Sequence, residues 1–346
     1  MDDNYSVFAV LNREGTVEVH KRIEHEPGAI QAFLEEYPPG TQVALESVGN
    51  WYWIADEIEA ADCIPLLTHP AKAKVMMGNV NKTDKLDAKG LATLLRLNSL
   101  PYVWLPPGKT RDDRELPRTR MALTKIRTAL KNRIHATLAK YNQKLEGASD
   151  IFIPKWREEL LGTIDQLPPE TQKCMYTELE LLDHLFGQIQ QLETRIRQLV
   201  EESEPIQLLK TLPGIGDILG IVIHQEIGRM DRFPSAEHFA SYCGVVPTVK
   251  ASGGKFHHGR MRKQSNQYLK WAFIEAANVV VLRHTSPKWR SRHVARLYRR
   301  VRNRKGSKIA VGAVARHLAE AAYWVLTKHE PYREPAISRQ VTPKSG

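Results

Sequence analysis

The sequence predicts a mixed fold in which an α/β domain is followed by all-α segments. Over residues 4–100, strand-like apolar runs alternate with helical patterns, which is typical of a mixed sheet with helices on its faces. After residue 112, apolar residues recur every three or four positions, as they do in amphipathic helices. The length of 346 residues suits two or three domains, because single cores rarely grow beyond about 250–300 residues.

We expect an α/β domain over 1–105, a helical arm over 112–204, a helical domain over 206–330 and a polar tail over 331–346. Prolines at 101, 106 and 107 mark the linker after the first domain. The elements expected in that domain are strands at Tyr5–Leu11 and Thr16–Arg22, a helix near 29–37, a strand at Gln42–Ser47, a helix near 51–61, a strand at Ile64–Thr68 and a helix from about Asp84.

Composition excludes several classes of protein. No run of about 18 apolar residues is present, so we expect no membrane span, and the N-terminus does not resemble a secretion signal. Cys63, Cys174 and Cys243 are isolated, which argues against a disulfide framework or a zinc site and predicts a cytoplasmic protein. The net charge is +11, with the excess in the C-terminal half, which points to a nucleic-acid partner.

An acidic pair opens the helix that follows N-K-T-D-K-L-D at 81–87. Asp84 and Asp87 are three residues apart and therefore share one face of its first turn. Two such carboxylates can bind Mg²⁺ together with phosphate oxygens. The alternative is ordinary capping, with Asp84 as N-cap and Asp87 as an acidic partner. Lys82 and Lys85 oppose the helix dipole, which favours the approach of an external polyanion.

Glu46 ends the strand that we expect near the centre of the sheet. The carboxyl ends of such strands commonly hold ligand sites, although a solvated glutamate is the plain alternative. A hairpin at the start of the chain lacks the strand that would normally precede it and occupy the centre of the sheet. Met1–Asn4 is too short and too polar to be that strand.

The predicted arm consists of two helices, near 118–141 and 170–202, packed antiparallel as a protruding arm or a dimerisation element. The first has an apolar stripe of Leu123, Ile126, Leu130, Ile134, Leu138 and Tyr141. The second has a coiled-coil stripe of Leu182, Leu185, Ile189, Leu192, Ile196 and Leu199. We interpret both stripes as packing surfaces.

Three basic or glycine-rich segments of the C-terminal domain are candidates for nucleic-acid binding. The L-P-G-I-G turn at 212–216 leaves the backbone of Gly214 and Gly216 open to a phosphate, as in a helix-hairpin-helix, although a plain helix–helix turn is the alternative. Residues 288–308 hold ten Lys or Arg and no acid, so phosphate contact competes there with a merely solvated basic face. The third segment is a Gly-rich basic loop at 251–263. The candidate cations of the last two segments are Lys255, Arg260, Arg262, Lys263, Arg299 and Arg300.

Four motifs in this order resemble a known family: Q-V-A-L-E-S-V-G at 42–49, N-K-T-D-K-L-D-A at 81–88, L-P-G-I-G at 212–216 and A-S-G-G-K at 251–255. Together they resemble the DEDD-type transposases of insertion sequence 110 and its relatives. The resemblance implies an RNase H-like (RuvC-like) first domain, a coiled coil and a C-terminal domain with a serine nucleophile. It also implies Mg²⁺, DNA, a guiding bridge RNA and a homo-oligomer, as a dimer or a tetramer.

The resemblance assigns catalytic roles to four residues. Glu46, Asp84 and Asp87 match the acidic metal ligands, and Ser252 matches the serine that attacks the phosphodiester. Without the family, a serine in a Gly-rich turn is usually structural. Since a serine hydroxyl needs activation, the resemblance implies that Mg²⁺ polarises the phosphate, with acids and serine from different subunits meeting at one DNA strand.

The family's first aspartate has no counterpart here. Lining up residues 6–15 puts it one position before Met1, and neither Asp2 nor Asp3 is in register to replace it. We therefore predict that the sequence starts late, at an internal methionine, or is a decayed copy that lacks the central strand and one metal ligand. Two rival functions follow: a RuvC-like junction nuclease that uses water, and a non-catalytic DNA- or RNA-binding protein.

Overall fold

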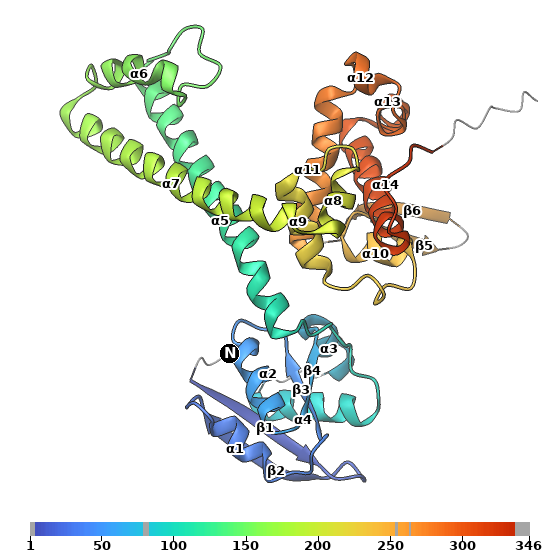
Figure 1. Ribbon diagram of the computed structural model, residues 1–346. Helices are drawn as coiled ribbons and strands as arrows, with labels where there is room; N and C mark the ends of the chain where they lie inside the picture. Colours follow the sequence, from blue (N-terminus) through green and yellow to red (C-terminus); the bar gives the residue numbers. More distant parts are fainter. Residues whose placement is uncertain (1–3, 79–82, 253–254, 263, 336–346) are drawn as a thin grey trace, which may run out of the picture. The chain divides into compact units, whose positions relative to one another are not determined.

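The computed structural model describes residues 4–78, 83–252, 255–262 and 264–335 (Figure 1). Between residues 250 and 258 it describes backbone alone. The chain forms two compact units, Met1–Pro107 and Gly108–Gly346, which are treated separately below. The division falls within residues 101–115, which the sequence predicts as a linker, and from Gly108 onward that stretch is helical instead.

The N-terminal unit contains two separate pairs of strands. Strands β1 (Tyr5–Leu11) and β2 (Val17–Glu24) form an antiparallel hairpin, and β3 (Gln42–Glu46) and β4 (Ile64–Thr68) are parallel. The helices are α1 (Ala29–Leu34), α2 (Trp51–Ala60), α3 (Pro70–Met77) and α4 (Asp84–Arg96). The predicted strands and helices of this domain are therefore confirmed in type and order, with ends displaced by a few residues.

The prediction of one mixed sheet is wrong for the described part of the unit. There, β1 pairs only with β2 and β3 pairs only with β4. The two pairs are joined by packing instead, because their apolar side chains and those of α1 and α2 form one core. Helix α4 contacts both β1 and β3. Its first turn meets the start of β1, where the Tyr5 hydroxyl reaches Asp84.

The predicted arm is built from α5 (Gly108–Lys140) and α7 (Pro169–Glu201), with a short 3₁₀ helix (Pro154–Trp156) and α6 (Arg157–Ile164) between them. The stripe predicted on α7 is largely confirmed, since Leu182, Leu185, Ile189 and Ile196 are buried. The stripe predicted on α5 is wrong at Ile126 and Tyr141, which are 47% and 41% exposed.

Helix α5 is also longer than predicted, and its first turns bury residues that the predicted stripe does not include. Its first half packs against α9 (Asp217–Ile227) rather than against α7 alone, so another face is buried there. Arg114, Pro117 and Met121 lie on this buried face, and Met121 joins the large C-terminal core. The predicted stripe is buried at Ile134 and Leu138, which pack with α6 and α7.

The remaining helices surround one hydrophobic core. They are α8 (Glu204–Lys210), α9, α10 (Ala236–Tyr242), α11 (Gln267–Arg283), α12 (Pro287–Arg290), α13 (His293–Lys305) and α14 (Ser307–Lys328). Helix α14 has the length and apolar composition to cross a membrane. Its apolar side is used inside the protein, however, because Ala310, Val314 and Leu318 are fully buried. We therefore assign it as a core helix.

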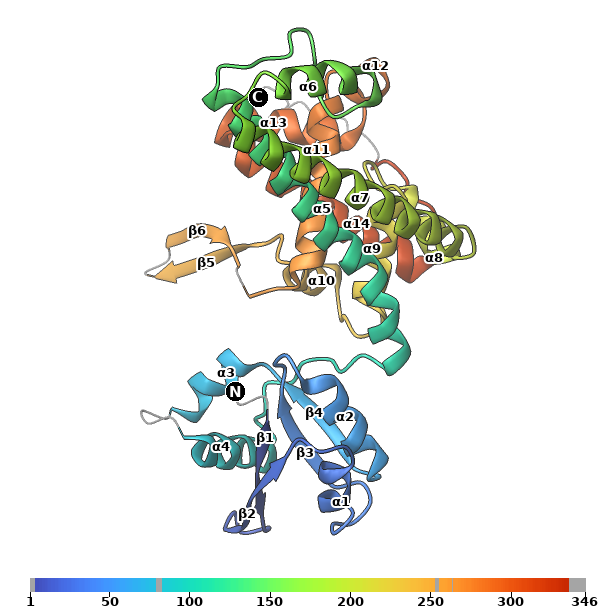
Figure 2. The ribbon, with the colours of Figure 1, turned by 90° about the vertical axis from the view of Figure 1, so that its left-hand side faces the viewer.

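The Gly-rich segment predicted as a loop is a β-hairpin. Strands β5 (Pro247–Ser252) and β6 (Lys255–Met261) pair antiparallel and project from the helices (Figure 2). The C-terminal unit is therefore not purely helical. Glycines and basic residues hide the strand pattern in the sequence, while backbone pairing satisfies the N–H and C=O groups that the two strands turn towards each other.

Part of the predicted tail is docked. The Tyr332 amide donates to Thr211 Oγ1 at 2.8 Å, and Arg292 forms an ion pair with Glu334 at 3.1 Å. Residues 336–346 lie outside the described residues.

Candidate functional site

The acidic pair lies in the first turn of α4. Thr83 is the N-cap, and its hydroxyl accepts a hydrogen bond from the Leu86 amide at 3.3 Å. The interpretation of Asp84 as N-cap is therefore wrong, and both Asp84 and Asp87 are helical residues of the first turn. Asp84 is exposed and Asp87 is half-buried. The capping role that competed with ligand binding at Asp84 is thus filled by its neighbour.

Asp84 has a partner that the sequence does not reveal. The hydroxyl of Tyr5, at the start of β1, donates to Asp84 Oδ2 at 2.9 Å. The guanidinium of Arg22, from the partner strand, lies 3.7 Å from the centroid of the Tyr5 ring. The hairpin therefore orients one carboxylate of the pair.

Glu46 is the last residue of β3 and is half-buried. Among the residues that the structure describes, no group of three or more His, Cys, Asp or Glu side chains is arranged to hold a metal ion. Glu46, Asp84 and Asp87 therefore do not form a ready three-ligand site. A smaller donor set still suits Mg²⁺, which proteins commonly hold by one or two carboxylates while phosphates and water complete its shell. Asp84 and Asp87, three residues apart in one turn, provide such a set.

Of the two lysines predicted beside the acidic pair, the structure describes one. Lys85 is exposed in the first turn of α4, whereas Lys82 lies outside the described residues. Its ammonium group is therefore available to a phosphate that approaches this turn.

Ser252 is the last residue of β5, where it pairs with Lys255 at the end of the hairpin farthest from the helices. Arg260 and Arg262, near the other end of β6, are exposed, while Lys263 lies outside the described residues. The backbone thus puts the predicted nucleophile at the far end of a two-stranded ribbon, with basic residues at its root.

The root of the hairpin is fixed by close packing. A Cβ at Gly259 would lie 2.4 Å from Thr248 Oγ1, and that hydroxyl donates to the Arg260 carbonyl at 3.1 Å. A Cβ at Gly312 of α14 would lie 2.5 Å from the terminal methyl of Met261. The Met261 methyl group therefore packs against α14, and Thr248 braces the two strands where they leave the helices.

The L-P-G-I-G turn connects α8 and α9. Gly214 has φ +86°, and a Cβ there would lie 2.4 Å from the carbonyl oxygen of Ala276 in α11. Gly216 is exposed at the N-cap of α9 and has open space around it. The structure therefore gives Gly214 a packing role and leaves Gly216 accessible to a phosphate.

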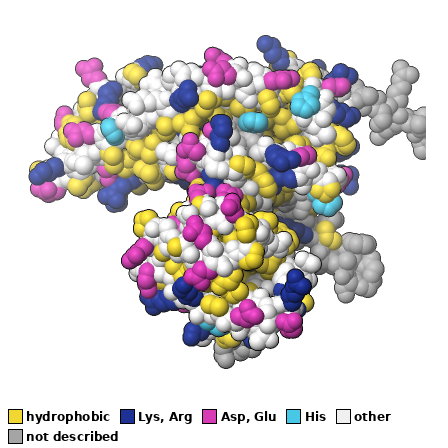
Figure 3. Space-filling view, turned by 60° about the horizontal axis from the view of Figure 1, so that its bottom comes forward, with side chains coloured by type: hydrophobic (Ala, Val, Ile, Leu, Met, Phe, Trp, Pro, Cys, Tyr) yellow, Lys and Arg dark blue, Asp and Glu magenta, His cyan; other side chains and the backbone are white. Residues whose placement is uncertain are grey.

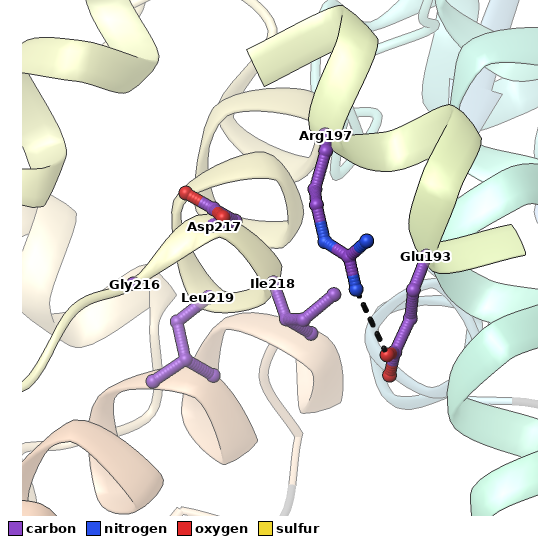
Figure 4. Close-up of a pocket in the computed structure, with 6 residues that line it drawn as sticks. All are labelled: Glu193, Arg197, Gly216, Asp217, Ile218 and Leu219. Atoms are coloured by element: carbon purple, nitrogen blue, oxygen red, sulfur yellow. Dashed lines mark ion pairs between the residues drawn. The ribbon is translucent and has the colours of Figure 1, made fainter. Parts of the chain in front are cut away.

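A cavity of about 250 Å³ opens at the start of α9 (Figure 4). Arg197 reaches into it from α7 and pairs with Glu193 at 3.9 Å. Asp217, also in its wall, pairs with Lys210 at 2.8 Å. Both cations near this turn are thus already matched by carboxylates.

The two arginines predicted on α13 differ in role. Arg299 donates to the carbonyls of His284 and Arg290 at 2.8 and 2.6 Å, so its guanidinium ties α13 to α11 and α12. Arg300 is exposed. On the face of the molecule in Figure 3, Lys and Arg side chains are interspersed with Asp and Glu, so the excess of positive charge is not gathered there.

The C-terminal unit contains a buried ionic cluster that was not predicted from the sequence. Glu226, near the end of α9, is 2% exposed and pairs with Arg118 of α5 at 2.7 Å. A carboxylate within the apolar run I-L-G-I-V-I-H-Q-E-I is the only sequence feature that hints at it. Its partner cannot be found by spacing, because it lies 108 positions away.

Two family models match the chain. The model described as "Transposase IS116/IS110/IS902 family" matches residues 206–294, and the DEDD transposase model of IS110, described as "Transposase", matches residues 3–143. The matched segments contain Glu46, Asp84, Asp87 and Ser252.

Curated relatives carry the same description. The transposase for insertion sequence element IS1111A of Coxiella burnetii is 26% identical over 73% of this chain and 69% of its own length. The transposase for insertion sequence element IS1328 of Yersinia enterocolitica is 25% identical over 85% of this chain and 86% of its own length. A putative transposase of Sinorhizobium fredii is 24% identical over 96% of this chain and 85% of its own length. The chain therefore belongs to the IS116/IS110/IS902 family and is a DNA transposase of an insertion sequence.

Proposed function

We propose that this transposase cuts and rejoins DNA through a phosphoserine at Ser252, with Mg²⁺ held at the acidic turn of an RNase H-like domain. The observation that supports the serine is its position, because Ser252 ends β5 at the far end of a projecting hairpin. A nucleophile there can reach a DNA strand without the helical body having to approach it.

The chemistry is a reversible phosphoryl transfer. The Ser252 hydroxyl oxygen attacks a DNA phosphorus while the bond from that phosphorus to a deoxyribose oxygen breaks. The serine loses its proton, and the departing DNA oxygen takes up a proton to become a hydroxyl. In the reverse sense, a hydroxyl of another DNA end attacks the phosphoserine, releases Ser252 and joins the strands, so no external energy source is needed.

Asp84 and Asp87 would hold Mg²⁺, and the family resemblance adds Glu46, at the end of β3, as the candidate for a third carboxylate. The bound ion would neutralise charge that develops on the phosphate oxygens. The residues themselves supply the negative charge, and Tyr5 orients Asp84 by its hydrogen bond of 2.9 Å.

Exposed backbone and cationic groups would bind the DNA and RNA phosphates. Gly216 offers an open helix N-terminus, and Lys85, Arg260, Arg262 and Arg300 are exposed cations. From the family resemblance we infer a guiding bridge RNA and a homo-oligomer. The oligomer would bring a serine and an acidic turn from different subunits to one DNA strand.

The test is capture of the covalent protein–DNA adduct by the full-length chain, with element-end DNA, candidate guide RNA and Mg²⁺. We expect an adduct with the wild-type protein, none with Ser252→Ala, and strongly reduced formation with Asp84→Asn. Ser149→Ala replaces an exposed serine of the same unit, one outside the proposed machinery, and should behave as wild type.

The rival functions give different results. A water-dependent nuclease would cleave DNA without an adduct and would retain cleavage in Ser252→Ala. A non-catalytic binding protein would bind DNA without Mg²⁺-dependent cleavage in any variant. Either outcome would overturn the proposed function.

A further inference from the structure

The buried cluster around Glu226 has no part in the chemistry proposed above. Both oxygens of its carboxylate are used: Arg118 donates to Oε1 at 2.7 Å and to Oε2 at 3.1 Å. Asn266 Nδ2 donates to Oε2 at 2.8 Å. Glu226 belongs to α9, Arg118 to α5, and Asn266 lies between β6 and α11. One carboxylate thus joins three parts of the unit.

Arg114 adds a second link from α5 to the same point. Its guanidinium donates to the carbonyls of Gln225 and Glu226, both at 2.9 Å, and so satisfies backbone groups at the end of α9. Arg118 also lies 4.5 Å from the centroid of the Tyr268 ring on α11. Helix α5 is therefore tied to α9 and α11 at several points.

Asn266 connects this cluster to the hairpin. Its side-chain oxygen accepts from the amides of Tyr268 and Leu269 at 3.0 Å each, so it is the N-cap of α11. The backbone N–H of Asn266 donates to the carbonyl of Tyr242 at 3.2 Å. The chain is thus held where it enters α11, a few residues after the end of β6.

Stability alone does not explain such a cluster. Replacing a buried ion pair by apolar residues of similar size is often neutral or stabilising, whereas removing one partner is strongly destabilising. Fully satisfied polar networks impose a single geometry, because few arrangements satisfy every donor and acceptor. The geometry imposed here is the direction in which the hairpin leaves the helical body relative to α5.

We propose that Glu226 and Asn266 are positioning residues for Ser252, fixing the root of the β5–β6 hairpin against α5. This inference rests on the proposed function of Ser252. Neither residue touches the reacting atoms. They act through the root of the hairpin, and a displacement of about 1 Å in a reacting group can slow a reaction about 100-fold.

The test exchanges the two hydrogen-bonding groups. Asn266→Asp keeps the N-cap but sets a second carboxylate oxygen against Glu226 in place of the Nδ2 donor. We expect adduct formation to slow at least about tenfold, with DNA affinity changed less than about threefold. The double variant Asn266→Asp with Glu226→Gln restores one amide and one carboxylate and should recover most of the rate.

Ser235→Ala is the matched control. Ser235 caps α10 in the same unit, and its hydroxyl accepts from the His238 amide. The substitution should lower the melting temperature without a specific loss of adduct formation. If Asn266→Asp leaves the rate unchanged, or if the double variant does not recover it, the inference is wrong.

A second measurement does not depend on the serine chemistry. Spin labels at Arg260→Cys on β6 and Lys125→Cys on α5, in a Cys174→Ser background, report the distance between the hairpin root and α5. We expect a narrow distribution that broadens in Asn266→Asp and narrows again in the double variant. An unchanged distance distribution in Asn266→Asp would refute the positioning role. If Ser252→Ala still formed the protein–DNA adduct while the distribution broadened as expected, only the proposed function would be refuted.

Discussion

Tyr5 donates its phenolic hydroxyl to Asp84 Oδ2 at 2.9 Å and thereby joins the first strand of the hairpin to the first turn of α4. The ring of the same tyrosine lies against the guanidinium of Arg22, 3.7 Å from its centroid. Orientation of a ligating carboxylate by an outer hydrogen bond commonly contributes to metal affinity. Tyr5 therefore belongs with the acidic pair, although it carries no charge.

The first prediction removes this hydroxyl alone. Tyr5→Phe should weaken Mn²⁺ binding, with Mn²⁺ as the probe for Mg²⁺, by about tenfold, because Asp84 loses the group that orients it. Titration of the full-length chain followed by electron paramagnetic resonance measures the free ion directly. Tyr102→Phe, at an exposed tyrosine of the same unit, is the control. Equal affinities for the two variants would contradict the prediction.

The order of elements was predictable from the sequence because it is a local property. Alternating and helical apolar patterns locate β1 to β4 and α4, and the proline-rich linker locates the boundary near Pro107. The hairpin of β5 and β6 was not predicted, because glycine and basic residues obscure the alternation of apolar and polar side chains along its strands. The buried residues in the first half of α5 were not predicted, because α9, far along the sequence, decides which face is buried there.

The candidate site was predictable only where a local pattern or the family resemblance identified it. The helix that presents Asp84 and Asp87 follows from the spacing of apolar residues after them. The partners of Asp84 and Glu226 do not follow, since Tyr5 lies 79 positions away and Arg118 lies 108. The separate functions of Arg299 and Arg300 also depend on which carbonyls the fold brings near.

The second prediction separates the two glycines of the L-P-G-I-G turn. Gly214→Ala should destabilise the protein by on the order of 2–4 kcal/mol, because it combines positive φ with a Cβ 2.4 Å from the Ala276 oxygen. Gly216→Ala should lower stability by less than about 1 kcal/mol, since its Cβ meets open space. Urea unfolding measures both. Similar losses at the two positions would show that the turn is not held against α11 as described.

The third prediction compares neighbouring arginines. Arg299→Ala should destabilise the protein by about 1–3 kcal/mol, because two helix-end carbonyls lose a charged donor. Arg300→Ala should leave stability unchanged and weaken DNA binding. It should also reduce the slope of log Kd against log salt concentration by about one, as expected for the loss of one phosphate contact. Thermal unfolding and binding at several salt concentrations distinguish the two. A normal salt slope in Arg300→Ala would remove that residue from the interface.

The last prediction concerns pH and the docked segment after α14. Burial, with a smaller contribution from His293, lowers the pKa of His317 from its ordinary value of 6.5 to about 4, and Glu334 opposes this shift. His317 Nε2 lies 3.3 Å from the Tyr332 hydroxyl, and burial raises the pKa of that phenol. His317 is therefore held neutral between α14 and the segment that carries Tyr332.

A histidine with a lowered pKa binds its proton more tightly in the unfolded chain. Its contribution to stability is complete above about pH 6.5 and is lost as the pH falls towards 4. Between pH 7 and pH 5 the free energy of unfolding should fall by about 2 kcal/mol through this group. His317→Gln should remove that part of the pH dependence, while the effect of His293, whose pKa burial also lowers, is shared by both proteins. Urea unfolding at the two pH values measures the difference, with His184→Gln at an exposed histidine of α7 as control. If His317→Gln loses as much stability as the wild type over this range, the buried histidine is not the group that titrates.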